Sequence, residues 1–154
     1  MRELAVVGWR EWIALPELGV EAVKAKIDTG ARSAALHAWD LEIVERDGQP
    51  WARFAVHPFQ RDDTTVIPCE APVVDERDVR SSNGEVERRP VIATDLCLVD
   101  RHYRIELSLT RRDEMGFRVL LGRRALRRRF VVDPGRSFLA GGTTVAPPSP
   151  RSSA

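Results

Sequence analysis

The sequence predicts an all-β domain, because short apolar runs separated by turn residues fill the chain and helical periodicity is nearly absent. In one run, Tyr103, Ile105, Leu107 and Leu109 alternate with polar residues, which is the period of a half-buried strand. Many short strands at this spacing favour a closed or sandwiched β domain over alternating strands and helices. The expected strands are Leu4–Val7, Val20–Ile27, Ala34–Trp39, Leu41–Val44, Trp51–Val56, Val66–Pro68, Val91–Ala93, Leu96–Val99, Tyr103–Leu109 and Val119–Leu121.

Turn signals and a single short helix complete the expected domain. Asp47-Gly48 and Asn83-Gly84 are two-residue hairpin signals, since both residue types tolerate positive φ. Only Gly122–Phe130 is expected to be helical. A single domain over residues 1–139 is predicted, followed by a Gly-, Thr-, Pro- and Ser-rich tail at 140–154 that is expected to be disordered.

Composition narrows the class of protein. The 154 residues fit one domain, 43% of them are hydrophobic, and the net charge is +1. Of the 24 basic residues, only Lys24 and Lys26 are lysines, and arginine suits bidentate recognition of carboxylates. A GC-rich genome is the plainer explanation for most of these arginines. The near-neutral total argues against nucleic-acid binding.

Neither a membrane nor an oxidising compartment is expected. No apolar run is long enough to span a bilayer, and the first residues lack the pattern of a secretory signal. Cys69 and Cys97 are a distant pair without CxxC spacing, so two buried, reduced thiols are expected rather than a disulfide. The expected location is the cytoplasm.

Asp28-Thr29-Gly30 is the candidate catalytic element, because it places a carboxylate where a strand ends in a tight turn. An aspartic peptidase needs two carboxylates that share one proton and hold a water molecule between them. Thr29 offers a hydroxyl that can lock the turn, and Gly30 removes a Cβ that would block close approach. Alone the tripeptide is weak evidence, and its structural alternative is an Asx-turn at a strand end.

Two later features strengthen that interpretation. Leu120-Leu121-Gly122-Arg123 is the apolar-apolar-Gly element that packs beside the catalytic turn in pepsin-like folds. Between the two elements lies a hairpin that could close over substrate as a flap. Candidate substrate-binding residues there and beside the turn are Arg32, Arg80, Ser81, Ser82, Asn83, Gly84 and Arg88. The order turn, hairpin, apolar-apolar-Gly-Arg is that of one retropepsin subunit.

The chain resembles a bacterial family often labelled ATP-dependent zinc proteases and now grouped with retropepsin-like aspartic endopeptidases. The resemblance implies a retropepsin-like closed β-barrel with a flap hairpin and one short C-terminal helix. It covers roughly residues 5–138 and rests on Gly8-Trp9-Arg10-Glu11-Trp12, Leu15–Gly19, Ala25–Ala38, Val56-His57-Pro58, Arg77–Gly84, Leu120–Leu126 and Val132-Asp133-Pro134.

The older label does not fit the residues. A P-loop ends in Gly-Lys, and neither lysine follows a glycine. The zinc motif His-Glu-x-x-His is also absent, although a dispersed site from His37, His57 and a cysteine stays open as an alternative. We therefore expect neither a metal nor another cofactor.

One departure from viral retropepsins affects the support of the catalytic turn. Those enzymes carry an acidic residue where Arg32 stands, and it pairs with the arginine that corresponds to Arg123. Arg123 is therefore expected to find another partner, with Asp133, Glu11 and Asp75 as candidates.

Two functions remain open at this stage. A single Asp-Thr-Gly per chain favours a homodimeric aspartic peptidase, and the alternative is a non-catalytic β-barrel that binds acidic peptides in an arginine-lined groove. Guanidinium groups at Arg32, Arg80 and Arg88 would favour Glu- or Asp-rich peptides. The resemblance points the same way, because the family looks linked to glutamate-ligase systems.

Overall fold

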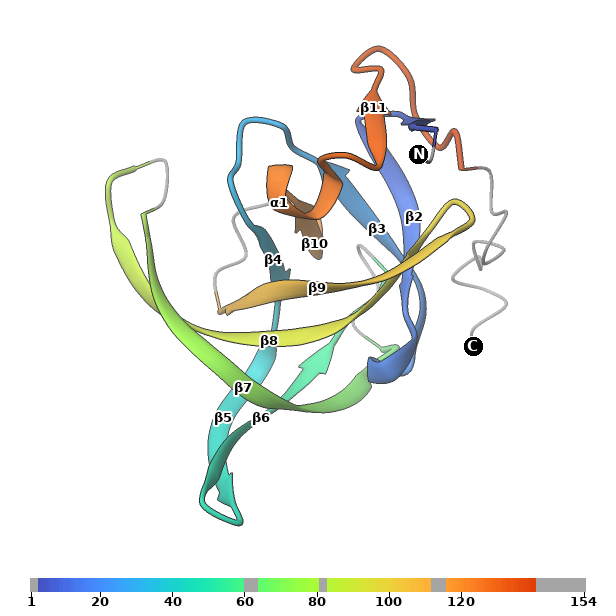
Figure 1. Cartoon of the computed structure of the whole chain (residues 1–154). Coiled ribbons are helices and arrows are strands. Elements are labelled where there is room, and N and C mark those ends of the chain that lie inside the picture. Colours follow the sequence, from blue (N-terminus) through green and yellow to red (C-terminus); the bar gives the residue numbers. More distant parts are fainter. Residues whose placement is uncertain (1–2, 60–63, 81–82, 112–115, 141–154) are drawn as a thin grey trace.

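A computed structural model of the chain describes residues 3–59, 64–80, 83–111 and 116–140 (Figure 1). Strands dominate these ranges, with one turn of 3-10 helix and one short α-helix. In chain order the elements are β1 (Ala5–Val7), β2 (Arg10–Leu15), the 3-10 helix Pro16–Leu18, β3 (Val20–Ile27), β4 (Ala34–His37), β5 (Trp39–Arg46), β6 (Gln49–Val56), β7 (Ile67–Arg80), β8 (Val86–Leu98), β9 (Arg101–Thr110), β10 (Val119–Leu121), α1 (Arg123–Leu126) and β11 (Phe130–Val132).

Six strands close into a mixed barrel. They follow the order β2-β3-β10-β4-β9-β8, and pairing of Ala14 in β2 with Cys97 in β8 closes the ring. β10 runs parallel to β3 and β4 runs parallel to β9, whereas the other barrel pairs are antiparallel. Fully buried aliphatic side chains belong to every strand of the barrel, among them Ile13, Leu15, Val23, Leu36, Ile92, Leu107, Leu109 and Leu121.

Beyond the barrel, the sheet continues from β8 through β7 and β6 to β5. The β7–β8 hairpin arches well past the barrel in Figure 1. The end at which β7 leads into β8 lies in the upper part of the view, as does the loop between β3 and β4. A separate two-stranded parallel sheet joins β1 to β11, and so ties the two ends of the described chain together.

The predicted closed β-barrel with one short helix is confirmed, and most expected strands are present with shifted ends. The expected strands Val91–Ala93 and Leu96–Val99 are instead one strand, β8, because the polar pair Thr94-Asp95 between them stays in register with β9. Two strands were not predicted. β2 contains the charged pair Arg10-Glu11, which breaks the apolar pattern, and β11 follows a run of arginines. The helix is shorter than expected because Arg127 adopts an extended conformation. None of the helices in the described ranges is long and apolar enough to cross a membrane.

The hairpin predictions had mixed outcomes. Asp47 and Gly48 both adopt positive φ between β5 and β6, as a two-residue turn requires. The second hairpin differs, because β7 ends at Arg80 and β8 begins at Val86, which leaves a longer connection than the turn expected at Asn83-Gly84. Its strands are also longer than predicted, since the charged run after Val74 pairs with β8 beyond the barrel.

At the C-terminal end, the predicted tail begins at a residue that is anchored in the domain. Ala140 is buried, and its N–H donates to the Glu11 carboxylate at 2.9 Å. Residues 141–154 lie outside the described residues, so their expected disorder stays a prediction.

Candidate active site

Strand β10 organises the site by lying between two segments that are distant in sequence. Its Leu121 is in register with Ile27 of β3 on one side, and its Leu120 is in register with Ala35 of β4 on the other. The loop 28–33, which connects β3 to β4, therefore has to pass around the end of β10. This crossing brings the two predicted elements, Asp28-Thr29-Gly30 and the apolar-apolar-Gly segment, into direct contact.

Asp28 lies at the start of this loop and is held through its backbone. Its N–H donates to the Leu121 carbonyl at 2.9 Å, which continues the parallel β3–β10 ladder by one residue. Its carbonyl accepts the Ala31 N–H at 3.2 Å, and its side-chain Oδ1 accepts the Gly30 N–H at 3.0 Å. The carboxylate is half-buried, whereas Thr29 and Gly30 are exposed. The turn thus presents a fixed carboxylate at the surface of one chain.

Gly122 allows the loop to pack against the start of α1. A Cβ at this position would stand 2.4 Å from the Ser33 carbonyl oxygen and 2.8 Å from that of Ala31. Just beyond it, the Arg123 N–H donates to the Ala31 carbonyl at 2.9 Å and the Arg124 N–H donates to the Arg32 carbonyl at 3.0 Å. The close approach that these bonds need is available only to glycine.

The guanidinium of Arg123 supports the catalytic turn itself. Its Nη1 donates to the Thr29 carbonyl at 3.0 Å. The three expected carboxylate partners are engaged elsewhere: Glu11 accepts backbone N–H groups, Asp75 pairs with Arg77, and Asp133 accepts the Gly135 N–H. The predicted carboxylate partners of Arg123 are therefore wrong, because its guanidinium donates to the Thr29 backbone carbonyl instead.

The remaining predicted binding residues lie on two separate segments, the loop 28–33 and the β7–β8 hairpin. Arg88 donates to Glu76 and Asp78 of its own hairpin, and Arg80 donates to the Gly84 carbonyl at 3.1 Å. Arg32 lies on the catalytic loop with an exposed side chain. In the hairpin connection Asn83 Oδ1 accepts the Glu85 N–H, while Ser81 and Ser82 lie outside the described residues.

Two residues of the alternative zinc site, His37 and His57, belong to an aromatic stack. Trp39 lies between His37 and His57, with ring centroids 3.7 and 4.0 Å away. Cys69 is buried and its Sγ contacts the Leu18 carbonyl, and burial raises the pKa of this thiol to about 12. Across the described ranges, no three His, Cys, Asp or Glu side chains form a group that could hold a metal ion.

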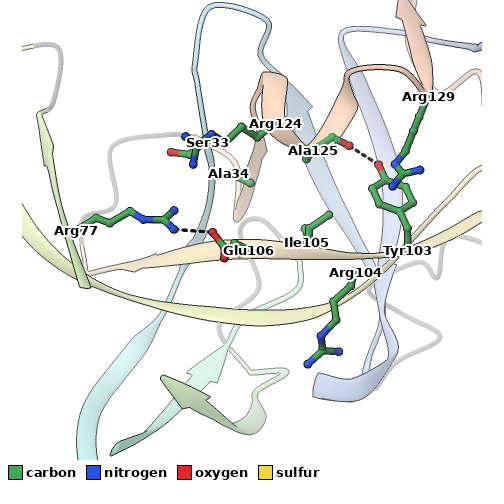
Figure 2. A pocket seen from close by; sticks show the side chains of 10 residues that line it. All are labelled: Ser33, Ala34, Arg77, Tyr103, Arg104, Ile105, Glu106, Arg124, Ala125 and Arg129. Atoms are coloured by element: carbon green, nitrogen blue, oxygen red, sulfur yellow. Dashed lines mark hydrogen bonds and ion pairs between the residues drawn. The ribbon is translucent and has the colours of Figure 1, made fainter. Parts of the chain in front are cut away.

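A pocket that was not predicted from the sequence adjoins the candidate catalytic loop 28–33. It is lined by Ser33, Ala34, Arg77, Tyr103, Arg104, Ile105, Glu106, Arg124, Ala125 and Arg129 (Figure 2). Tyr103 donates its hydroxyl hydrogen to the Ala125 carbonyl, and burial raises the pKa of this phenol to about 12. The concentration of arginines at 123–129 was the available signal, but only tertiary packing shows which of them face the pocket.

Comparisons with known proteins show the family and the fold of the chain. The sequence profile of the family described as RimB-like, retropepsin-like aspartic endopeptidase RimB, matches residues 6–143. A solved structure of a Legionella pneumophila protein of unknown function has 30% sequence identity and a TM-score of 0.73. That similarity covers 90% of this chain and 99% of the Legionella chain.

Curated relatives are longer proteins. A probable alpha-L-glutamate ligase of Shewanella halifaxensis is 45% identical over 136 residues, and one of Shewanella pealeana is 46% identical over the same length. A third, from Parasynechococcus marenigrum, is 45% identical over 141 residues. The matches cover 88–92% of this chain, which spans about 30% of the length of each of these relatives.

Proposed function

Because the chain belongs to the RimB-like family of retropepsin-like aspartic endopeptidases, we propose that it is one subunit of a homodimeric aspartic peptidase. The observation that carries this proposal is the placement of Asp28 on a loop fixed by Leu121 and Gly122, with its carboxylate at the surface. Each chain supplies one Asp-Thr-Gly carboxylate, that of Asp28. The chemistry needs two, so a second copy would complete the site.

In the proposed mechanism the two Asp28 carboxylates share one proton and hold a water molecule. The ionised carboxylate takes a proton from the water as it attacks the scissile carbonyl, and the protonated partner donates a hydrogen bond to the carbonyl oxygen. The Arg123–Thr29 and Gly30–Asp28 hydrogen bonds keep the turn in position, because a loose carboxylate would lose the pairing.

We further propose that the substrates are acidic, Glu-rich peptides or protein extensions. Two observations support this preference. The curated relatives that share this region carry names that imply glutamate as a substrate of those longer proteins. In addition, Arg32 lies on the catalytic loop, and its side chain makes no hydrogen bond or ion pair with the rest of the described chain. A guanidinium there can pair with a substrate carboxylate.

The test compares wild-type protein with Asp28→Asn on a library of peptides. The amide is nearly isosteric and cannot shuttle a proton, so peptide cleavage should disappear while the circular dichroism spectrum is unchanged. Asp47→Asn is the matched control, because this exposed aspartate lies in a turn where asparagine is equally favourable. Full activity of Asp28→Asn would exclude the aspartic mechanism.

Subunit mixing tests the dimer separately. Adding excess Asp28→Asn protein to wild type should lower the activity per wild-type chain, because mixed dimers contain only one competent carboxylate. Gel filtration at the same concentration should give twice the mass of one chain. Activity that is unaffected by the added variant would refute the shared site.

A further inference from the structure

The pocket beside the loop 28–33 joins four parts of the molecule. It has a volume of about 200 Å³. Ser33 comes from the loop itself, Tyr103–Glu106 come from β9, and Arg77 comes from the part of β7 that pairs with β8 beyond the barrel. The segment after Gly122 completes it with Arg124 and Arg129. In Figure 2 the side chain of Arg124 lies beside Ser33, and the side chain of Arg77 extends from β7 toward Glu106 of β9.

The charges in this pocket are not balanced. Glu106 is the one carboxylate among the lining side chains, and Arg77 engages it at 2.6 Å. Arg104 turns away and pairs with Glu17 at 3.0 Å (Figure 2). Arg124 makes no ion pair with the described residues. The guanidinium of Arg129 likewise has no carboxylate partner in those ranges and stacks over the Tyr103 ring at 3.9 Å.

The register of the β7–β8 hairpin shows that Arg77 faces this pocket, whereas Arg88, which the sequence suggested, does not. Arg88 is in register with Asp78, whereas Arg77 is in register with Arg89. Consecutive residues of a strand point to opposite faces, so Arg77 and Arg88 lie on opposite faces of the hairpin. Because Arg77 shares a pocket with Ser33, its face is the one turned toward the catalytic loop. Arg88 lines a different concavity with Leu41 and Ile43.

We propose that the pocket is a substrate subsite that binds a carboxylate side chain of the peptide, with Arg124 as the cation that recognises it. The assignment rests on the proposed peptidase function and adds the residues that set specificity. Arg124 is anchored to the catalytic loop through its backbone N–H, which donates to the Arg32 carbonyl. A carboxylate bound there therefore has a fixed relation to Asp28, and the Arg129–Tyr103 stack holds a second positive charge in the same pocket.

The experiment measures kcat/KM for two peptides that differ by a single Glu-to-Gln change, in wild type, Arg124→Gln and Arg127→Gln. Arg127 follows α1, is exposed, and is not among the residues that line the pocket, so its substitution removes the same charge from the same segment. Arg124→Gln should lower the preference for the Glu peptide roughly three- to tenfold through KM, as expected for a partly exposed charge-assisted pair. Arg127→Gln should leave that preference unchanged. Equal effects of the two substitutions, or no effect of either, would overturn the assignment.

A binding measurement separates this assignment from the proposed function. Fluorescence anisotropy of the same peptides is recorded with Asp28→Asn and with Asp28→Asn combined with Arg124→Gln. If wild type cleaves neither peptide, the proposed peptidase function is refuted. The subsite is still supported if adding Arg124→Gln to Asp28→Asn weakens binding of the Glu peptide and leaves binding of the Gln peptide unchanged. Inorganic phosphate is added as a competitor. Displacement by phosphate together with equal binding of the Glu and Gln peptides would identify a site for free anions and overturn the peptide subsite.

Discussion

Glu11 offers a sharp test of how the two ends of the domain are held together. Its carboxylate is fully buried. One oxygen accepts the N–H groups of Gly8 at 2.7 Å and Leu139 at 2.9 Å, and the other accepts the N–H of Ala140 at 2.9 Å. A single side chain in β2 therefore satisfies three backbone donors, two of them in the C-terminal segment. Loss of the carboxylate should release that segment.

The substitution Glu11→Gln changes this contact with little change in volume. With the amide oxygen kept toward Gly8 and Leu139, its NH₂ group faces the N–H of Ala140, and two donors then oppose each other. One charge-assisted hydrogen bond is lost and two become neutral, which should cost roughly 3 kcal/mol of unfolding free energy. Urea denaturation followed by tryptophan fluorescence measures this cost, and Trp12, one of the four tryptophans, stacks on Phe138 of the same segment.

Glu21→Gln is the matched control, since Glu21 lies exposed on β3 and its loss should change stability by less than about 0.5 kcal/mol. Glu11→Ala leaves all three donors without an acceptor and should cost roughly 4–6 kcal/mol, close to the whole stability of a small domain. If Glu11→Gln denatures at the wild-type urea midpoint with the wild-type slope, the carboxylate does not hold the segment.

Two further predictions concern the catalytic loop and the pocket. Gly122→Ala places a Cβ 2.4 Å from the Ser33 carbonyl oxygen, so it should cost roughly 2–4 kcal/mol and remove peptide cleavage, and retained activity would contradict the packing. Burial raises the pKa of Tyr103 from 10.0 to about 12. Because the folded-state pKa is the higher, the stability that this phenol contributes is present below pH 10 and is lost as pH rises toward 12. Tyr103 is the single tyrosine, so a tyrosinate absorbance titration of the native protein measures it, and a midpoint near pH 10 would contradict its burial.

The sequence predicted best those parts of the fold that local pattern controls. Val20–Ile27 and Val119–Leu121 are strands because their apolar residues fill the barrel, and Asp47-Gly48 is a turn because both residues tolerate positive φ. The β2 strand was missed because Glu11 is a charge at a core position. Its burial makes sense only once the backbone donors of a segment more than a hundred residues away surround it.

The candidate site likewise has parts that the sequence predicted and parts that depend on tertiary structure. Contact between the Asp28 turn and Gly122 was anticipated from their order in the chain, and the structure shows the backbone bonds that join them. The faces of the hairpin were not predictable, since they depend on the register between β7 and β8. A shift of one residue between the two strands would put Arg77 and Arg88 on the same face of the hairpin. Ion pairing with Glu76 and Asp78 likewise engages Arg88, whereas Arg124 of α1 makes no ion pair with the described residues.

In the proposed peptidase, Arg32 and Arg123 together would suit the Asp28 turn to the proposed acidic substrate. Arg123 supports the turn through the neutral Thr29 carbonyl, so no carboxylate is needed beside Asp28 for that purpose. A substrate glutamate about 8 Å from an ionised Asp28 would be repelled by roughly 2 kcal/mol at an effective dielectric constant of about 20. A guanidinium at a similar distance from that glutamate offsets this repulsion, and Arg32 and Arg124 are both anchored to the loop by the hydrogen bond that joins their backbones. An acidic residue at position 32 would add to the repulsion instead. The same exchange of charge that separates this chain from the viral enzymes is therefore what an acidic substrate requires.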